Sequence, residues 1–138
     1  MIDDYVASGD VRFVYRHFIV IGQESIVAAM GTECAAEQDM FWEYHDAIFD
    51  NWDEARQNRF GLSWLQSTAE SLELDLPAFM DCLNSGRHFE RIRASQIDGM
   101  GRGIRGTPSV FVNGERVGGP DYEVYRTAIE AALEESNQ

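Results

Sequence analysis

Cys34 and Cys82 are the only two thiols in this 138-residue chain, and they stand 48 positions apart. Redox enzymes commonly use a Cys-x-x-Cys pair at the start of a helix, where the helix dipole lowers the pKa of the first thiol. The sequence contains no such pair. The residues alone leave three interpretations open: two free buried thiols, a structural disulfide, or a distant catalytic pair. Acidic residues close by in sequence, such as Glu33, argue against a reactive thiolate because negative charge raises a thiol's pKa.

The other residue types that could do chemistry follow no known catalytic or metal-binding spacing. His17, His45 and His88 are far apart and lack the spacing of a metal site. The glycines at 99, 101 and 103 lack the lysine and the preceding strand of a phosphate loop. The serines and aspartates match no triad motif. We therefore predict neither a metal nor a cofactor.

Thr107-Pro108 stands directly before a run of strand-forming residues, 109–113. Proline cannot donate to a sheet, so it belongs at the first residue of a strand or on an edge. The following Asn113-Gly114 is a strong signal for a tight hairpin turn into Glu115–Val117. From the residues alone, the simplest interpretation is a trans proline that begins a strand.

The remaining elements are predicted from periodicity and capping residues. The pattern indicates the end of a helix at residues 2–7, a strand at 11–16, and helical segments between residues 24 and 100. Asp75 should cap one of these helices, which should stop at Gly86. Asp121 should cap a last helix. A strand, several helices and then a hairpin with a helix form an α/β pattern with a helical insertion.

The composition, 44% hydrophobic and 25% charged, is that of one globular domain. A net charge of −13 argues against nucleic acid and anionic membrane surfaces as partners. The sequence has no apolar stretch long enough to insert into a membrane. Its acidic beginning, MIDDYVASGD, is not a signal peptide.

Four segments resemble the DsbA-like thiol-disulfide oxidoreductases, which have a thioredoxin fold with an inserted helical subdomain. They are YVASGDVRFVYRHF, CAAEQDMFWEYHDAIF, FMDCLNSG and GIRGTPSVFVNGERVGG, in the order of the family. The resemblance implies a single α/β domain over residues 1–138, with a thioredoxin-like core and a helical insertion over residues 24–100. It also implies a cis peptide bond at Thr107-Pro108, where these residues would hold the backbone of a polypeptide substrate. A disulfide between Cys34 and Cys82 and an extracytoplasmic location follow from the same resemblance.

The resemblance also shows what this sequence lacks. In the family, a strand and a helix carrying Cys-x-x-Cys precede the segment at 11–16, and this chain begins inside that helix. We expect an oxidoreductase domain that lacks its catalytic cysteines, with no catalytic residue of its own. Three explanations stay open: an enzyme whose N-terminal part is missing, a non-catalytic peptide-binding module, or a glutathione-dependent isomerase or transferase relative. The absent central strand would leave two strand edges unpaired, which predicts a homo-oligomer.

Overall fold

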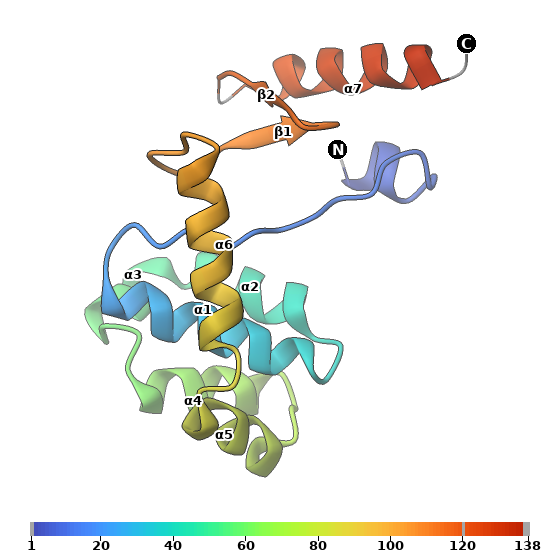
Figure 1. Cartoon of the computed structure of the whole chain (residues 1–138). Coiled ribbons are helices and arrows are strands. Elements are labelled where there is room, and N and C mark those ends of the chain that lie inside the picture. The colour runs from blue at the N-terminus through green and yellow to red at the C-terminus, as the bar shows by residue number, and fades with distance from the viewer. Residues whose placement is uncertain (1, 120, 137–138) are drawn as a thin grey trace. The chain divides into compact units, whose positions relative to one another are not determined.

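A computed structural model describes residues 2–119 and 121–136 of the chain (Figure 1). Helices dominate it, and they are followed by one hairpin and a last helix. In chain order the elements are η1 (Ile2–Val6), α1 (Gln23–Ala36), α2 (Phe41–Asp50), α3 (Trp52–Gln57), α4 (Leu62–Ser71), α5 (Leu76–Ser85), α6 (Phe89–Gly101), β1 (Val110–Val112), β2 (Glu115–Val117) and α7 (Tyr122–Ser136). None of the described helices is both long and apolar enough to cross a membrane.

The chain divides into two compact units, which we describe separately. The helical unit comprises His17–Arg102 and holds α1 to α6. The hairpin unit comprises Met1–Arg16 together with Gly103–Gln138 and holds η1, the two strands and α7. The elements are those of a thioredoxin-like fold, rich in helix and with a small sheet.

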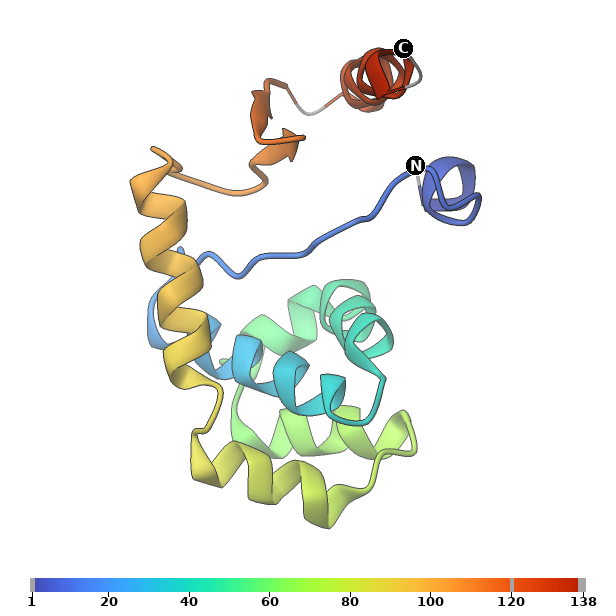
Figure 2. The ribbon, with the colours of Figure 1, turned by 45° about the vertical axis from the view of Figure 1, so that its right-hand side comes forward.

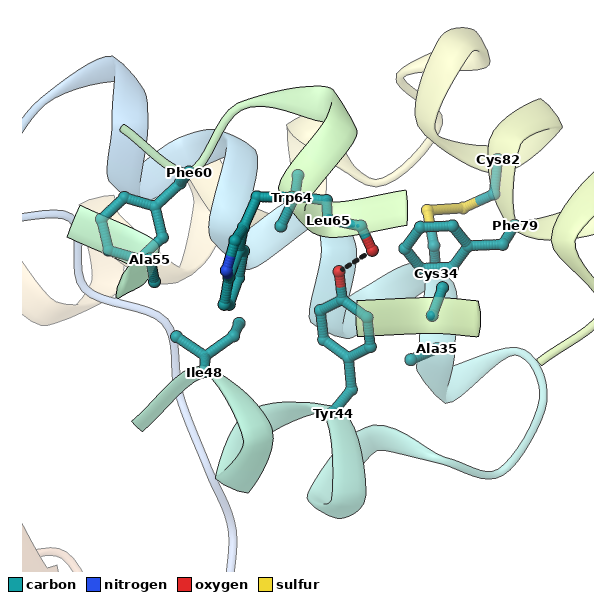
Figure 3. Close-up of a cluster of buried hydrophobic side chains, with 11 residues drawn as sticks. Cys34, Ala35, Tyr44, Ile48, Ala55, Phe60, Trp64, Leu65, Phe79 and Cys82 are labelled. Carbon is teal, nitrogen blue, oxygen red and sulfur yellow. Dashed lines mark hydrogen bonds between the residues drawn. A yellow bond between two sulfur atoms is a disulfide. The ribbon is translucent and has the colours of Figure 1, made fainter. Parts of the chain in front are cut away.

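Helix α1 is the centre of the helical unit. It contacts α2, α4, α5 and α6, and in both views it lies between α2 on one side and the pair α4 and α5 on the other (Figures 1 and 2). Gly31 on α1 lets the ring of Tyr44 on α2 lie close to the α1 backbone, because a Cβ built on Gly31 would lie 3.1 Å from Cε1 of Tyr44. The Tyr44 hydroxyl donates to the carbonyl of Leu65 on α4 at 2.9 Å (Figure 3). Burial of this phenol raises the pKa of Tyr44, so it stays a neutral donor.

The hairpin unit is organised around α7. The strands pair antiparallel, with Val110 opposite Val117, and α7 packs against both. The turn uses Asn113 and Gly114 at φ 48° and 91°, the two positive values that this tight turn requires. Hydrogen bonds then tie η1 to α7, since Tyr5 donates to Glu130 at 2.9 Å and Tyr122 to Asp4 at 2.5 Å.

Several local predictions are confirmed. Asp75 caps α5 by accepting a hydrogen bond from the Ala78 amide at 3.0 Å, and α5 stops at Gly86, which is left-handed at φ 63°. Asp121 accepts from the amide of Glu123 at 3.2 Å, as a cap of α7 should. In each case the partner lies within a few residues along the chain.

The predicted strand at residues 11–16 is wrong for this structure. The segment between η1 and α1 carries no strand assignment, and the described sheet has only the two strands β1 and β2. Alternating side chains favour an extended backbone, but a β-strand also needs a neighbouring strand to accept its hydrogen bonds. Among the described residues, only β1 and β2 are paired in this way.

Candidate functional site

The loop before β1 carries the predicted substrate-binding residues. The Thr107–Pro108 peptide bond is cis, the form that the sequence resemblance implies, and both residues are exposed. The hydroxyl of Ser109 donates to the Gly106 carbonyl at 2.8 Å and so closes the turn that contains this peptide bond. Within the described part of the chain, neither backbone group of Thr107 has a hydrogen-bond partner. The loop therefore presents an exposed residue whose amide and carbonyl are unpaired among the described residues, two positions before β1.

The two cysteines belong to the helical unit, whereas this loop belongs to the hairpin unit. Cys34 on α1 and Cys82 on α5 are joined by a disulfide, with their Cα atoms 5.7 Å apart (Figure 3). Both residues are fully buried, beside the ring of Phe79. The described residues contain no free cysteine. The sequence left open two free thiols, a structural disulfide or a catalytic pair, and the structure has the disulfide.

The acidic residues near the cysteines are paired with cationic side chains. Glu37, at the end of α1, accepts from Arg87 Nε at 2.7 Å and Nη2 at 2.5 Å, and from His88 Nε2 at 2.7 Å. The Arg87 hydrogen bonds lower the pKa of Glu37 to about 2, with His88 adding to the effect. Arg87 also pairs with Asp81 at 3.2 Å. Cations thus offset the negative charge around the bridge.

A second charged cluster lies one turn earlier on α1, and its acid and its histidine are buried. Glu33 is 5% exposed and His17 8% exposed, and His17 Nε2 lies 3.0 Å from Glu33 Oε1. Arg91 on α6 reaches the second carboxylate oxygen, Oε2, at 3.0 Å. The hydrogen bond with His17, helped by the charge of Arg91, lowers the pKa of Glu33 below its ordinary 4.5. Sequence spacing gave no sign of this cluster, because its members come from three distant segments.

Glu33→Gln is expected to destabilise the chain by about 1–3 kcal/mol at pH 7, because it replaces a buried, charge-assisted hydrogen bond. The folded-state pKa of Glu33 is depressed, so its contribution is complete above the unfolded value near 4.5 and is lost as the pH falls through the folded value. Urea unfolding from pH 7 to pH 3 should therefore show the two proteins converging below pH 4.5. Glu90→Gln, which removes an exposed carboxylate from α6, is the matched control. A constant difference over that range would contradict the assignment.

Comparison with known proteins places these features in a family. The thioredoxin family model matches residues 1–131. A protein named Na(+)/H(+) antiporter NhaA 3 from Salinispora tropica is 37% identical over 89% of this chain and 19% of its own length. A probable disulfide bond formation protein D from Bacillus anthracis is 27% identical over 95% of this chain and 62% of its own length. The chain thus spans about a fifth of the first protein and about three-fifths of the second.

Solved structures agree on the fold. The crystal structure of oxidised BdbD from Bacillus subtilis superimposes with a TM-score of 0.85, covering 96% of this chain and 74% of that one at 22% identity. The curated disulfide bond formation protein D from the same organism is 23% identical over 94% of this chain. The family-model match over nearly the whole chain establishes the membership, and the structural likeness agrees with it in fold: the chain belongs to the thioredoxin family.

Proposed function

We propose that this chain is the substrate-binding portion of a thiol-disulfide oxidoreductase and that it does not catalyse exchange by itself. Its substrates are polypeptides with thiols or disulfides, in line with relatives that are named disulfide bond formation protein D. The observation that carries the proposal is the exposed Thr107, whose backbone amide and carbonyl have no partner among the described residues. Thr107 and Pro108 hold the substrate backbone there, because an extended peptide adds to such a strand edge through main-chain hydrogen bonds.

The lack of a nucleophile supports the second half of the proposal. Thiol-disulfide exchange begins when a thiolate attacks a disulfide sulfur and forms a mixed disulfide. The sequence has no Cys-x-x-Cys, and its two cysteines are buried and bonded to each other. A substrate disulfide would find no accessible thiolate on this chain.

Two measurements on the purified chain test the proposal. Insulin reduction and dithiol oxidation should run no faster than with free thiol at equal concentration. Titration of an isotope-labelled chain with an unstructured, cysteine-free peptide should shift the amides of Gly106, Thr107 and Ser109 and leave those of α5 unchanged. Thr107→Ala is the matched control: it keeps both backbone groups, so the affinity should stay within about twofold. Turnover that Cys34→Ser abolishes, or peptide binding that leaves the Thr107 amide unmoved, would overturn the proposal.

A non-catalytic peptide-binding module is the second candidate, and the buried disulfide favours it because that bond removes both thiols from the surface. The DNA sequence upstream of Met1 helps to distinguish the two candidates. An in-frame segment upstream of Met1 that encodes a strand and Cys-x-x-Cys supports an enzyme portion, whereas an in-frame stop codon directly upstream excludes a wrongly assigned start codon. Saturable micromolar binding of glutathione would instead indicate the isomerase or transferase branch.

The organisation of the domain belongs to the same proposal. We assign residues 1–138 to one DsbA-like domain with residues 24–100 as its helical insertion, supported by the packing of α1 to α6 into one unit. An extracytoplasmic location is supported by the disulfide, because such bonds persist in oxidising compartments. Self-association through unpaired strand edges stays a prediction of the sequence. The side chain of Val14, 53% exposed, is consistent with it.

A further inference from the structure

We propose that reduction of the Cys34–Cys82 disulfide creates a zinc site, in which the two thiolates, His88 and Glu37 hold one Zn²⁺. The proposal is independent of the assigned oxidoreductase function, because it concerns only the helical unit. The observation behind it is a group of potential ligand atoms: Sγ of Cys82, a ring nitrogen of His88 and a carboxylate oxygen of Glu37 all lie within 4.8 Å of one another. Cys34 lies outside that group, but its sulfur is bonded to that of Cys82, so reduction frees it to move in as the fourth ligand.

Three helices supply these residues from fixed positions. Cys34 lies near the end of α1 and Glu37 is its C-cap, while Cys82 lies on α5. His88 is the N-cap residue of α6, and only residues 86–88 join α5 to α6. Rigid helices on three sides and one short connection make a preorganised site with one adjustable ligand, His88.

The two sulfur atoms make the largest change, because they are now bonded at 1.99 Å and must move apart to about 3.8 Å to bind the same ion. Zinc ligands lie about 2.0–2.3 Å from the metal in a tetrahedral arrangement, so neighbouring ligand atoms are roughly 3.3–3.8 Å apart. His88 Nε2 and Glu37 Oε1 are 2.7 Å apart and must separate by roughly half an ångström. Zinc then takes the place of the hydrogen atom that now joins the nitrogen and the oxygen, and the neutral imidazole carries its proton on Nδ1 instead.

The charges also suit zinc. Glu37 is ionised, so it accepts the hydrogen bond from His88 and is ready to act as an anionic ligand. Two thiolates and one carboxylate against a divalent cation leave one excess negative charge, and Arg87 is in place to balance it. Arg87 now occupies both carboxylate oxygens, so it has to yield one of them. Thiolate and imidazole ligands together select zinc over magnesium or calcium.

The redox step needs a reductant, which is a dithiol or a phosphine. A dithiol forms its own disulfide and passes two electrons and two protons to the bridge, whose S–S bond breaks to give two thiols. With a trialkylphosphine, the phosphorus takes an oxygen from water and the two protons of that water go to the thiols. Zinc binding then releases both thiol protons to the buffer, because the thiolate is the metal ligand.

The test compares oxidised and reduced forms of the same chain. Reduction uses a trialkylphosphine, since dithiols bind zinc themselves, and affinity is measured by competition with a zinc-binding dye. We expect one equivalent of Zn²⁺ on the reduced chain, bound at least about 100-fold more tightly than on the oxidised chain, because the disulfide offers no thiolate. Co²⁺ in place of Zn²⁺ should give a thiolate charge-transfer band on the reduced chain only. Equal affinities for the two forms would overturn the proposal.

Variants distinguish a zinc site that uses all four ligands from zinc binding by the two thiols alone. His88→Ala and Glu37→Gln should each weaken zinc binding to the reduced chain by about tenfold or more. His45→Ala, which removes a histidine outside the group, should leave the affinity unchanged. Circular dichroism follows the fold throughout: if the reduced chain unfolds without metal, one equivalent of zinc should restore its helices. Failure to restore them, or affinities that do not depend on His88, would overturn the proposal.

Discussion

Phe79→Ala is expected to lower the free energy of unfolding by about 3–5 kcal/mol, the usual cost of removing a large aromatic side chain from a packed core. Phe79 is fully buried on α5, and its ring centroid lies 5.4 Å from that of Tyr44 on α2. Its ring also lies beside the Cys34–Cys82 bridge (Figure 3). The substitution therefore leaves a cavity between α2 and α5, at the point where several core side chains meet.

Urea unfolding followed by circular dichroism measures this loss. Phe79→Leu is the conservative control, and it should recover much of the stability because leucine refills part of the volume. Phe49→Ala on α2 is the matched control for aromatic loss at the surface, since the Phe49 side chain is 55% exposed. A loss below about 1 kcal/mol for Phe79→Ala would show that the helices collapse into the space.

Reduction of the Cys34–Cys82 disulfide should lower the free energy of unfolding by a similar amount. The bridge closes a loop with a sequence separation of 48 residues. For such a loop the chain-entropy model gives about 4 kcal/mol, because the bridge restricts the unfolded chain more than the folded one. The melting temperature should fall by on the order of 10 °C.

The measurement compares oxidised and reduced chain in the presence of a metal chelator, so that any zinc binding does not mask the loss. Cys34→Ala/Cys82→Ala gives the same comparison without a reductant, and that variant should not respond to one. Mass spectrometry of the untreated protein that finds two alkylatable thiols would contradict the bridge itself.

The features that could be predicted from the sequence are those whose partners lie close together along the chain. Asp75 caps α5 through an amide three residues away, and Asn113-Gly114 forms a turn within itself. The thioredoxin-like fold was also predicted, but only from motifs that resemble a known family. Hydrogen bonds between residues close in sequence therefore predict the helix caps and the turn, and the family resemblance predicts the order of the elements.

The features that could not be predicted depend on distant residues. Glu33 and His17 are 16 positions apart, and Glu37 and Arg87 are 50 apart, so neither ion pair has a spacing signal. The strand predicted at 11–16 failed for the same reason, since alternation describes a strand's own faces and not whether a partner lies beside it. The pairing of the acidic residues near Cys34 with cations could therefore not be predicted.

The first residues of the helical unit are fastened to its last helix. Ser95 donates to the His17 carbonyl at 2.8 Å, and the Gln96 side chain bonds both backbone groups of Ile19, at 2.5 and 3.3 Å. From Gln96 to the end of the unit at Arg102 is only about 9 Å along a helix. The entry and exit of this unit are therefore neighbours, and a segment with adjoining ends can be transplanted into a surface loop of an unrelated host without stretching that loop. An inserted segment of this kind can change in length or be replaced during evolution while the domain that carries it keeps its fold.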